Sequence, residues 1–137
     1  MKILIFCLIA LVPSISAVTF DCLYGNFAYA ALNGSVYTCI VQTITQLEDP
    51  NLTSATGQHI GLKTDLTVKG VFIWNKYELT YIPQGIMKIY SGLVRLKISG
   101  SSIETLSGHE LDEYVYLKWL EISYSNIASI PSTLFAR

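Results

Sequence analysis

The residues from His109 to Glu113 come closest to a catalytic motif in this sequence. His109 and Glu110 are followed by Leu111, Asp112 and Glu113, a pattern close to HExxH, in which two histidines one helical turn apart bind zinc. Glu113 stands where the second histidine is needed, and no further histidine follows. A site with a single histidine would bind zinc poorly. The three carboxylates are therefore interpreted as a solvated charged surface rather than as catalytic groups.

Motifs for other enzyme chemistries are missing from the sequence. It contains no GxSxG nucleophile elbow, no GxGxxG dinucleotide loop and no phosphate-binding P-loop. His59, the other histidine, is expected to be a structural hydrogen-bonding residue rather than a catalyst. The sequence thus predicts no catalytic residue, no metal site and no cofactor.

The start of the chain has the pattern of a secretory signal peptide. Lys2 is the only charge before Asp21, a short apolar run begins at Ile3, and small residues follow this run. The alternative is a membrane anchor, but the run has about ten residues and a bilayer crossing needs about twenty. Cleavage after Ser16 is compatible with the pattern, and cleavage after Ala17 is preferred. We expect a secreted chain without a membrane span.

Removal of the signal peptide would leave two cysteines, Cys22 and Cys39. In an oxidising compartment they would form one disulfide, which would stabilise the fold by about 3 kcal/mol in the chain-entropy model. The alternative, a zinc site, would need histidines at ligand spacing, and both histidines are far away in sequence. In a secreted chain, the two sequons at Asn33 and Asn51 would be acceptors for N-linked glycans.

The composition excludes two classes of protein. The 137 residues are 51% hydrophobic and 14% charged, too apolar for a disordered chain. Nine basic residues stand against ten acidic residues, so the basic excess that nucleic-acid binding requires is missing. The length allows one domain.

A repeat with a period of 24 residues is the strongest signal in the sequence. The segments 93–106 and 117–130 align so that every apolar position superposes, in an LxxLxI pattern followed by two further apolar residues. A looser copy begins at Val68. Stacking such copies would form a continuous core from short strands and their preceding turns. The expected copies span residues 68–92, 93–116 and 117–137. The last copy is incomplete, so we expect the natural chain to continue beyond it.

These copies resemble leucine-rich repeats. The N-terminal segment of the chain resembles the amino-terminal cap of secreted insect leucine-rich-repeat proteins. The cap resemblance rests on Cys22, on the run 36–41 and on the run 57–61. It implies an α/β-type leucine-rich-repeat solenoid, β-rich here, with a disulfide-pinned cap and about three repeats. The implied organisation is a signal peptide over 1–17, a cap over 18–67 and repeats over 68–137. Within the cap we expect strands over 20–24 and 36–41, and a polar loop over 47–57.

Alternation within each repeat strand predicts which side chains face the concave side of such a sheet. These side chains are aromatic and charged, and the candidate partner-binding residues are Phe72, Trp74, Arg95, Lys97, Trp119 and Glu121. Aromatic residues beside arginine are typical of binding hot spots. The structural alternative is that the aromatic side chains pack beneath the cap. Three strands offer a face of about 280 Å², whereas a standard interface takes about 800 Å² per partner, so a partner would also contact the cap or further repeats.

The function predicted from these features is non-catalytic recognition of another protein outside the cell, on the concave strand face. By resemblance this would serve immune or developmental signalling. The alternatives are a structural or adhesive matrix component that contacts further copies of itself, and an ectodomain fragment of a Toll-like receptor. A secreted hydrolase is disfavoured because no catalytic constellation is found.

Overall fold

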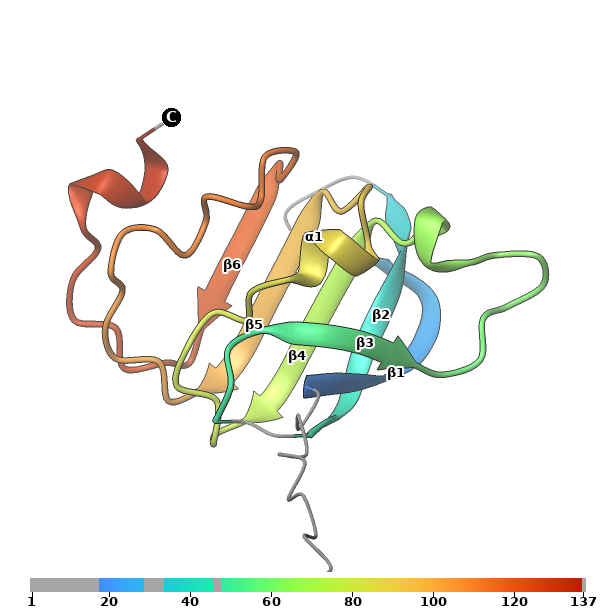
Figure 1. Ribbon diagram of the computed structural model, residues 1–137, viewed down its shortest axis with the longest axis horizontal. Helices are drawn as coiled ribbons and strands as arrows, with labels where there is room; N and C mark the ends of the chain where they lie inside the picture. Colours follow the sequence, from blue (N-terminus) through green and yellow to red (C-terminus); the bar gives the residue numbers. More distant parts are fainter. Residues whose placement is uncertain (1–17, 29–33, 46–47, 137) are drawn as a thin grey trace, which may run out of the picture.

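The computed structural model describes residues 18–28, 34–45 and 48–136. Within these ranges the chain forms one open sheet of six strands in the order β3-β1-β2-β4-β5-β6 (Figure 1). The strands are β1 (Val18–Ala28), β2 (Ser35–Thr45), β3 (Leu52–Thr56), β4 (Gly70–Lys76), β5 (Arg95–Ser101) and β6 (Trp119–Ser123). A short helix, α1 (Ile86–Ile89), and two 3-10 turns, Asp65–Thr67 and Ser132–Phe135, lie in the connections. The proposed signal peptide and the Asn33 sequon lie outside the described residues.

The N-terminal part of the sheet is an antiparallel hairpin of β1 and β2, extended at its outer edge by β3, which runs parallel to β1. Both hairpin strands are longer than the runs expected from the sequence, and β3 lies where a polar loop was expected. That expectation was wrong because the run of Thr, Ser and Ala between Leu52 and Thr56 can pair with β1, where Leu52 is buried opposite Val18. The disulfide joins Cys22 to Cys39 across the hairpin, as the sequence predicted.

The second half of the sheet is parallel. Partner residues are 25 positions apart between β4 and β5 (Gly70 with Arg95) and 24 positions apart between β5 and β6 (Arg95 with Trp119). At the equivalent position near the end of each of these strands, one residue has positive φ; it is the penultimate residue of β4 and β5 and the residue directly after β6. These residues are Asn75 (φ 51°), Gly100 (φ 76°) and Tyr124 (φ 52°). The shared backbone conformation turns the chain out of the sheet at one edge and sends it across the core.

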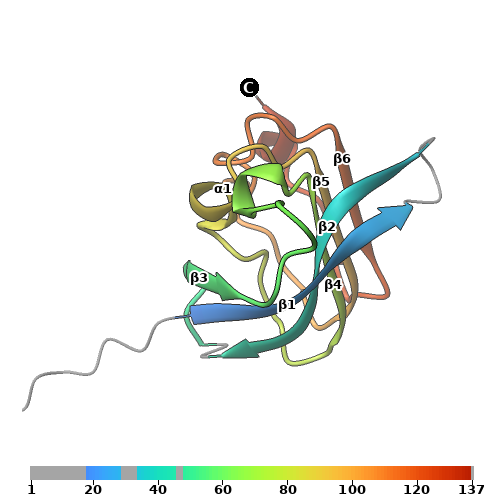
Figure 2. The same ribbon diagram turned by 90° about the vertical axis from the view of Figure 1, so that its right-hand side faces the viewer.

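The core lies on one side of the sheet. Val71, Ile73, Leu96 and Ile98 alternate along β4 and β5 and are fully buried. The connections fold back over these side chains, so that α1 and the segments around it lie on the core side in Figure 2. On the opposite side of the sheet, no helix lies over β4, β5 or β6 in the described chain, and Phe27 of the hairpin packs against Phe72 of β4.

The leucine-rich-repeat solenoid expected from the sequence is wrong. The described chain is a single open mixed sheet in which β1, β2 and β3 precede the predicted repeats. β2 pairs directly with β4, so that Cys39 lies opposite Val71 and Val41 opposite Ile73. The hairpin therefore shares one sheet and one core with the later strands. The physical reason is that the hairpin has the same inward alternation of apolar residues as the repeats, so it joins their sheet as further strands.

Candidate binding surface

The candidate surface is the side of the sheet that faces away from the core, here called the open face. It consists of the outward side chains of Leu23, Phe27, Val36, Ile40, Phe72, Trp74, Arg95, Lys97, Ser99, Trp119, Glu121 and Ser123, and the outward Thr38 is fully buried among them. All six candidate binding residues predicted from the sequence lie on it. The hairpin contributes further apolar residues that the sequence reasoning did not include, although alternation beside the inward-facing cysteines could have identified them.

One row of the open face crosses the sheet through Phe72. Strand register places Phe72 opposite Lys97 and Lys97 opposite Glu121. The Lys97 Nζ lies 3.1 Å from Glu121 Oε1 and 5.3 Å from the centre of the Phe72 ring. The same ammonium thus faces a carboxylate on one side and an aromatic ring on the other, which limits its conformational freedom.

Aromatic rings gather at the hairpin end of this row. The Phe27 and Phe72 ring centres are 4.8 Å apart, and the Phe72 and Trp74 ring centres are 6.4 Å apart. Phe72 is almost buried, with 9% of its surface exposed, whereas Trp74 is 57% exposed. The alternative that the aromatic side chains pack beneath the N-terminal strands therefore applies to Phe72, whose ring packs against Phe27. Trp74 presents an open apolar surface.

A second row runs through Arg95, which lies opposite both Gly70 and Trp119. The guanidinium Nη1 donates a hydrogen bond of 3.2 Å to the carbonyl oxygen of Gly34, next to the hairpin turn. Arg95 therefore links the parallel strands to the tip of the hairpin. A third row ends with the Ser123 hydroxyl, which donates to Ser99 Oγ at 3.2 Å.

His59 belongs to a separate polar network where the hairpin meets the parallel strands. Its Nε2 lies 3.0 Å from Asp65 Oδ1 and its Nδ1 lies 3.1 Å from the Tyr37 hydroxyl. A carboxylate only accepts, so Nε2 carries the proton, and in the neutral imidazole Nδ1 accepts from Tyr37. The Tyr37 oxygen in turn accepts from the Ile60 N–H at 3.0 Å. The His59 ring also stacks on Tyr24, with centres 3.9 Å apart.

This network has the order of groups that activates a nucleophile, namely tyrosine, histidine and aspartate. Tyr37 is 5% exposed and its hydroxyl is engaged by two partners, so a substrate atom has no approach to it. The network therefore anchors the loop 57–64 to the hairpin. His59 makes the hydrogen bonds expected of a structural residue, and its lack of a catalytic role stays a prediction.

The HExxH-like segment does not assemble a metal site. His109 Nδ1 pairs with Asp112 Oδ2 at 3.1 Å on the surface. The Glu110 carboxylate accepts from the backbone N–H groups of Ser107 and Gly108; burial alone would raise its pKa, but these bonds outweigh burial and lower it. Glu113 Oε2 accepts from the Gly85 N–H at 2.8 Å. The Glu110 and Glu113 carboxylates thus stabilise the local backbone through hydrogen bonds to N–H groups. In the described ranges no three histidine, cysteine or acidic side chains are placed to hold a metal ion.

Comparison with known proteins gives no relative: no family model, no curated protein and no solved structure matches the chain. Among the described residues no helix has the length and apolar character needed to cross a bilayer.

Proposed function

We propose that this chain is a non-catalytic recognition module that binds another protein on its open face outside the cell. The observation that carries the proposal is the exposed Trp74 beside a set of side chains already held in place. Lys97 contacts both Phe72 and Glu121, and Phe72 stacks on Trp74, before any partner arrives. Preorganised side chains lose little entropy on binding, and tryptophan is strongly enriched among residues that dominate interface energies.

The open face has a larger area than the three parallel strands considered in the sequence analysis, and this larger area supports a protein partner. The face spans β1, β2, β4, β5 and β6, which at usual strand spacing gives about 24 Å of width and a footprint of about 480 Å². This footprint includes Leu23 on β1, which is 59% exposed, and it approaches the area that each partner contributes to a small transient interface. The apolar leader and the Cys22–Cys39 disulfide support secretion.

The test compares substitutions on and off the open face in the secreted full chain. Immobilised protein is exposed to native extracellular fluid, and bound proteins are identified by mass spectrometry and then titrated in purified form. Trp74→Ala should weaken binding of the identified partner by about tenfold or more, as expected for a hot-spot residue, with little change in melting temperature. Lys97→Glu should also weaken binding, but it places a second carboxylate opposite Glu121 and should lower the melting temperature as well. Tyr116→Ala removes an equally exposed aromatic ring that lies off the open face and should leave affinity unchanged.

Two results would contradict the proposal. One is a partner whose affinity falls with Tyr116→Ala and not with Trp74→Ala. The other is a large loss of thermal stability in Trp74→Ala with unchanged capture, which would make Trp74 a packing residue.

A further inference from the structure

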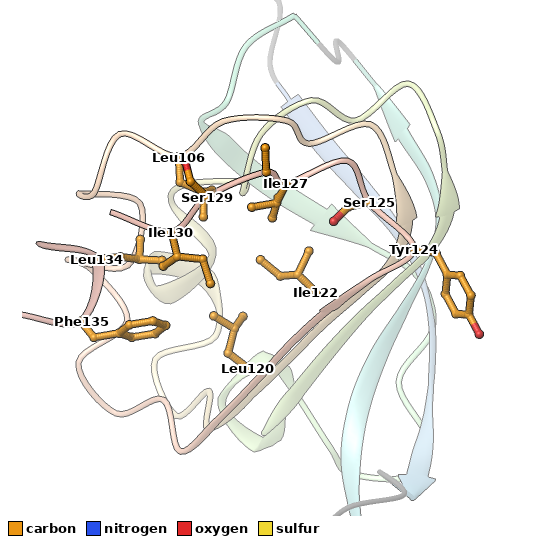
Figure 3. A pocket seen from close by; sticks show the side chains of 11 residues that line it. Leu106, Leu120, Ile122, Tyr124, Ser125, Ile127, Ser129, Ile130, Leu134 and Phe135 are labelled. Atoms are coloured by element: carbon orange, nitrogen blue, oxygen red, sulfur yellow. The ribbon is translucent and has the colours of Figure 1, made fainter. Parts of the chain in front are cut away.

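The connection between β3 and β4 holds aliphatic side chains out in water. Residues 57–67, here called the apolar loop, contain three large aliphatic residues: Ile60 is 56% exposed, Leu66 is 71% exposed and Leu62 is completely exposed. Figure 1 shows the loop in green, extending outward on the side of the sheet opposite to β6. It is thus separate from the apolar groove that lies beside β6 (Figure 3). Clusters of exposed apolar side chains mark sites that contact a protein or a membrane.

Hydrogen bonds fix the shape of the apolar loop and tie it to the hairpin. The Ile60 N–H donates to the Tyr37 hydroxyl at 3.0 Å, and the Lys63 N–H donates to the Ile60 carbonyl oxygen at 3.3 Å. Gly61, with a φ of 61°, permits this turn, which places Leu62 at its tip. The loop therefore presents its aliphatic side chains in a defined arrangement before it contacts anything.

Several backbone N–H groups of the loop already have partners inside the protein. Besides those of Ile60 and Lys63, the Thr64 N–H donates to Thr67 Oγ1 at 2.9 Å, and the Thr67 N–H donates to the Thr64 carbonyl oxygen at 2.9 Å. An apolar medium penalises every backbone group that loses water without gaining a partner. These internal hydrogen bonds lower that penalty for the loop.

The two charged side chains of the loop also have partners. Asp65 Oδ1 accepts from His59 Nε2 at 3.0 Å and from the Tyr24 hydroxyl at 3.2 Å. The Lys63 Nζ lies 4.2 Å from the centre of the Tyr37 ring. Contact between the loop and an apolar medium therefore does not require an unpartnered charge to lose its water.

The composition of the apolar loop favours a lipid surface over a pocket on a protein. The side chains that dominate protein interfaces are tryptophan, tyrosine and arginine, whereas leucine is under-represented among them. Residues 57–67 contain none of these three types, and the exposed apolar side chains are one isoleucine and two leucines. A bilayer takes up aliphatic side chains without a matching surface, with a strength that follows the apolar area buried.

We propose that the apolar loop binds the surface of a lipid bilayer, where Ile60, Leu62 and Leu66 enter the boundary between headgroups and acyl chains. The loop backbone stays at the level of the headgroups, and the loop does not cross the bilayer. Burial of aliphatic side chains drives the binding, so it requires neither anionic lipid nor low salt. The loop is not part of the open face, so this proposal is independent of the protein partner proposed for that face.

The experiment measures partition of the secreted full chain into sucrose-loaded phosphatidylcholine vesicles by sedimentation. We expect the bound fraction to rise with lipid concentration. The double change Leu62→Ser and Leu66→Ser should lower the partition coefficient by about tenfold or more, because two aliphatic side chains no longer enter the bilayer. Tyr116→Ser, at a ring that is 63% exposed and lies outside the loop, is the matched control and should leave the partition coefficient unchanged. All these changes are at exposed positions, so melting temperatures should stay within a few degrees of the parent.

Two further conditions test what drives the binding. Vesicles in which about a third of the lipid is phosphatidylglycerol carry a negative surface, and added salt screens charge. The partition coefficient should change by less than about twofold in either condition, since aliphatic burial does not depend on charge.

A tryptophan at the tip of the loop reports whether the loop itself enters the bilayer. The emission of Leu62→Trp should shift to shorter wavelength when phosphatidylcholine vesicles are added, and lipids with brominated acyl chains should quench it. Tyr116→Trp should show neither effect. Both variants keep Trp74 and Trp119, so the background emission is shared.

Three outcomes would overturn the proposal. One is equal partition of the parent chain and the double serine variant, or no partition of the parent at any lipid concentration. The second is binding that appears only with phosphatidylglycerol and that salt removes, which would show electrostatic adsorption through another surface. The third is a double serine variant that loses an identified protein partner while the parent does not bind vesicles, which would make the loop a protein contact. None of these outcomes bears on the open face, which the Trp74→Ala comparison tests separately.

Discussion

The hydroxyl oxygens of Tyr24 on β1 and Tyr90, the residue after α1, lie 2.9 Å apart in the interior. Tyr90 is fully buried, and its hydroxyl is also 3.3 Å from the Cys22 sulfur of the disulfide. The Tyr24 hydroxyl donates to Asp65 Oδ1 at 3.2 Å. This pair of tyrosines therefore joins the hairpin, the disulfide and the connection after β4 into one core.

Replacement of Tyr90 by phenylalanine should destabilise the fold. The change removes the hydrogen bond to Tyr24 and leaves the ring in place, so we expect unfolding free energy to fall by about 1 kcal/mol, with a drop of several degrees in melting temperature. Tyr116→Phe, at an exposed ring, is the control and should change stability by less than about 0.5 kcal/mol. An equal effect of the two changes would show that the buried hydroxyl pair contributes nothing.

Alkaline pH should weaken the fold through the same tyrosines. Burial raises the pKa of Tyr24 from 10.0 to about 12, and burial also raises the pKa of Tyr90. Between pH 10 and about 12 the unfolded chain has lost these protons while the native chain keeps them. The unfolded state then binds fewer protons, so stability falls as pH rises, and below pH 10 the contribution is complete. Denaturant titrations across this range should show the loss, and Tyr24→Phe should reduce its slope; an unchanged slope would contradict the assignment.

Tyr124 should be replaceable with a gain in stability. Its φ of 52° is unfavourable for a bulky residue, its side chain is 85% exposed, and the equivalent positions hold asparagine and glycine. Tyr124→Asn is expected to raise the free energy of unfolding by a few tenths to about 1 kcal/mol.

Gly100→Ala provides the opposite test at the equivalent position. Gly100 has a φ of 76°, and a β-carbon there would lie 2.9 Å from Asn75 Oδ1, so this change should destabilise by about 1 kcal/mol or more. Denaturant unfolding measures both variants. Destabilisation by Tyr124→Asn would show that the tyrosine ring makes a compensating contribution.

Asn51 should carry an N-linked glycan when the chain is secreted from eukaryotic cells. Its side chain is exposed just before β3, at the opposite edge of the sheet from β6, and its Nδ2 donates only to Asp49 Oδ1 among the described contacts. Asn51→Gln should remove a mass shift that is sensitive to glycosidase, and Thr53→Ser, which preserves the sequon, should retain it. If Asn51→Gln keeps the mass shift, the glycan is attached elsewhere, and Asn33 is the other sequon.

The candidate surface was largely predictable because strand side chains alternate with a fixed period of two. Once Val71, Ile73, Leu96 and Ile98 are taken as inward anchors, Phe72 and Lys97 must lie outward, and the spacing of the copies places Lys97 beside Glu121. No local pattern indicated that Phe27 would cover Phe72, because that contact depends on how the hairpin packs against β4. The contact between Arg95 and Gly34 is also a product of that packing.

By itself, the sequence determined the inward and outward sides of β4, β5 and β6, the spacing between these three strands and the partner of each cysteine, because these follow from short-range periodicity and from the small number of thiols. Only the tertiary structure decided that β2 pairs with β4, and thereby turned an expected solenoid with a separate cap into one mixed sheet. The tertiary structure also decided that Phe27 packs against Phe72. Pairing of distant strands depends on the fit of two surfaces that lie far apart in the chain, and local propensity does not encode that fit.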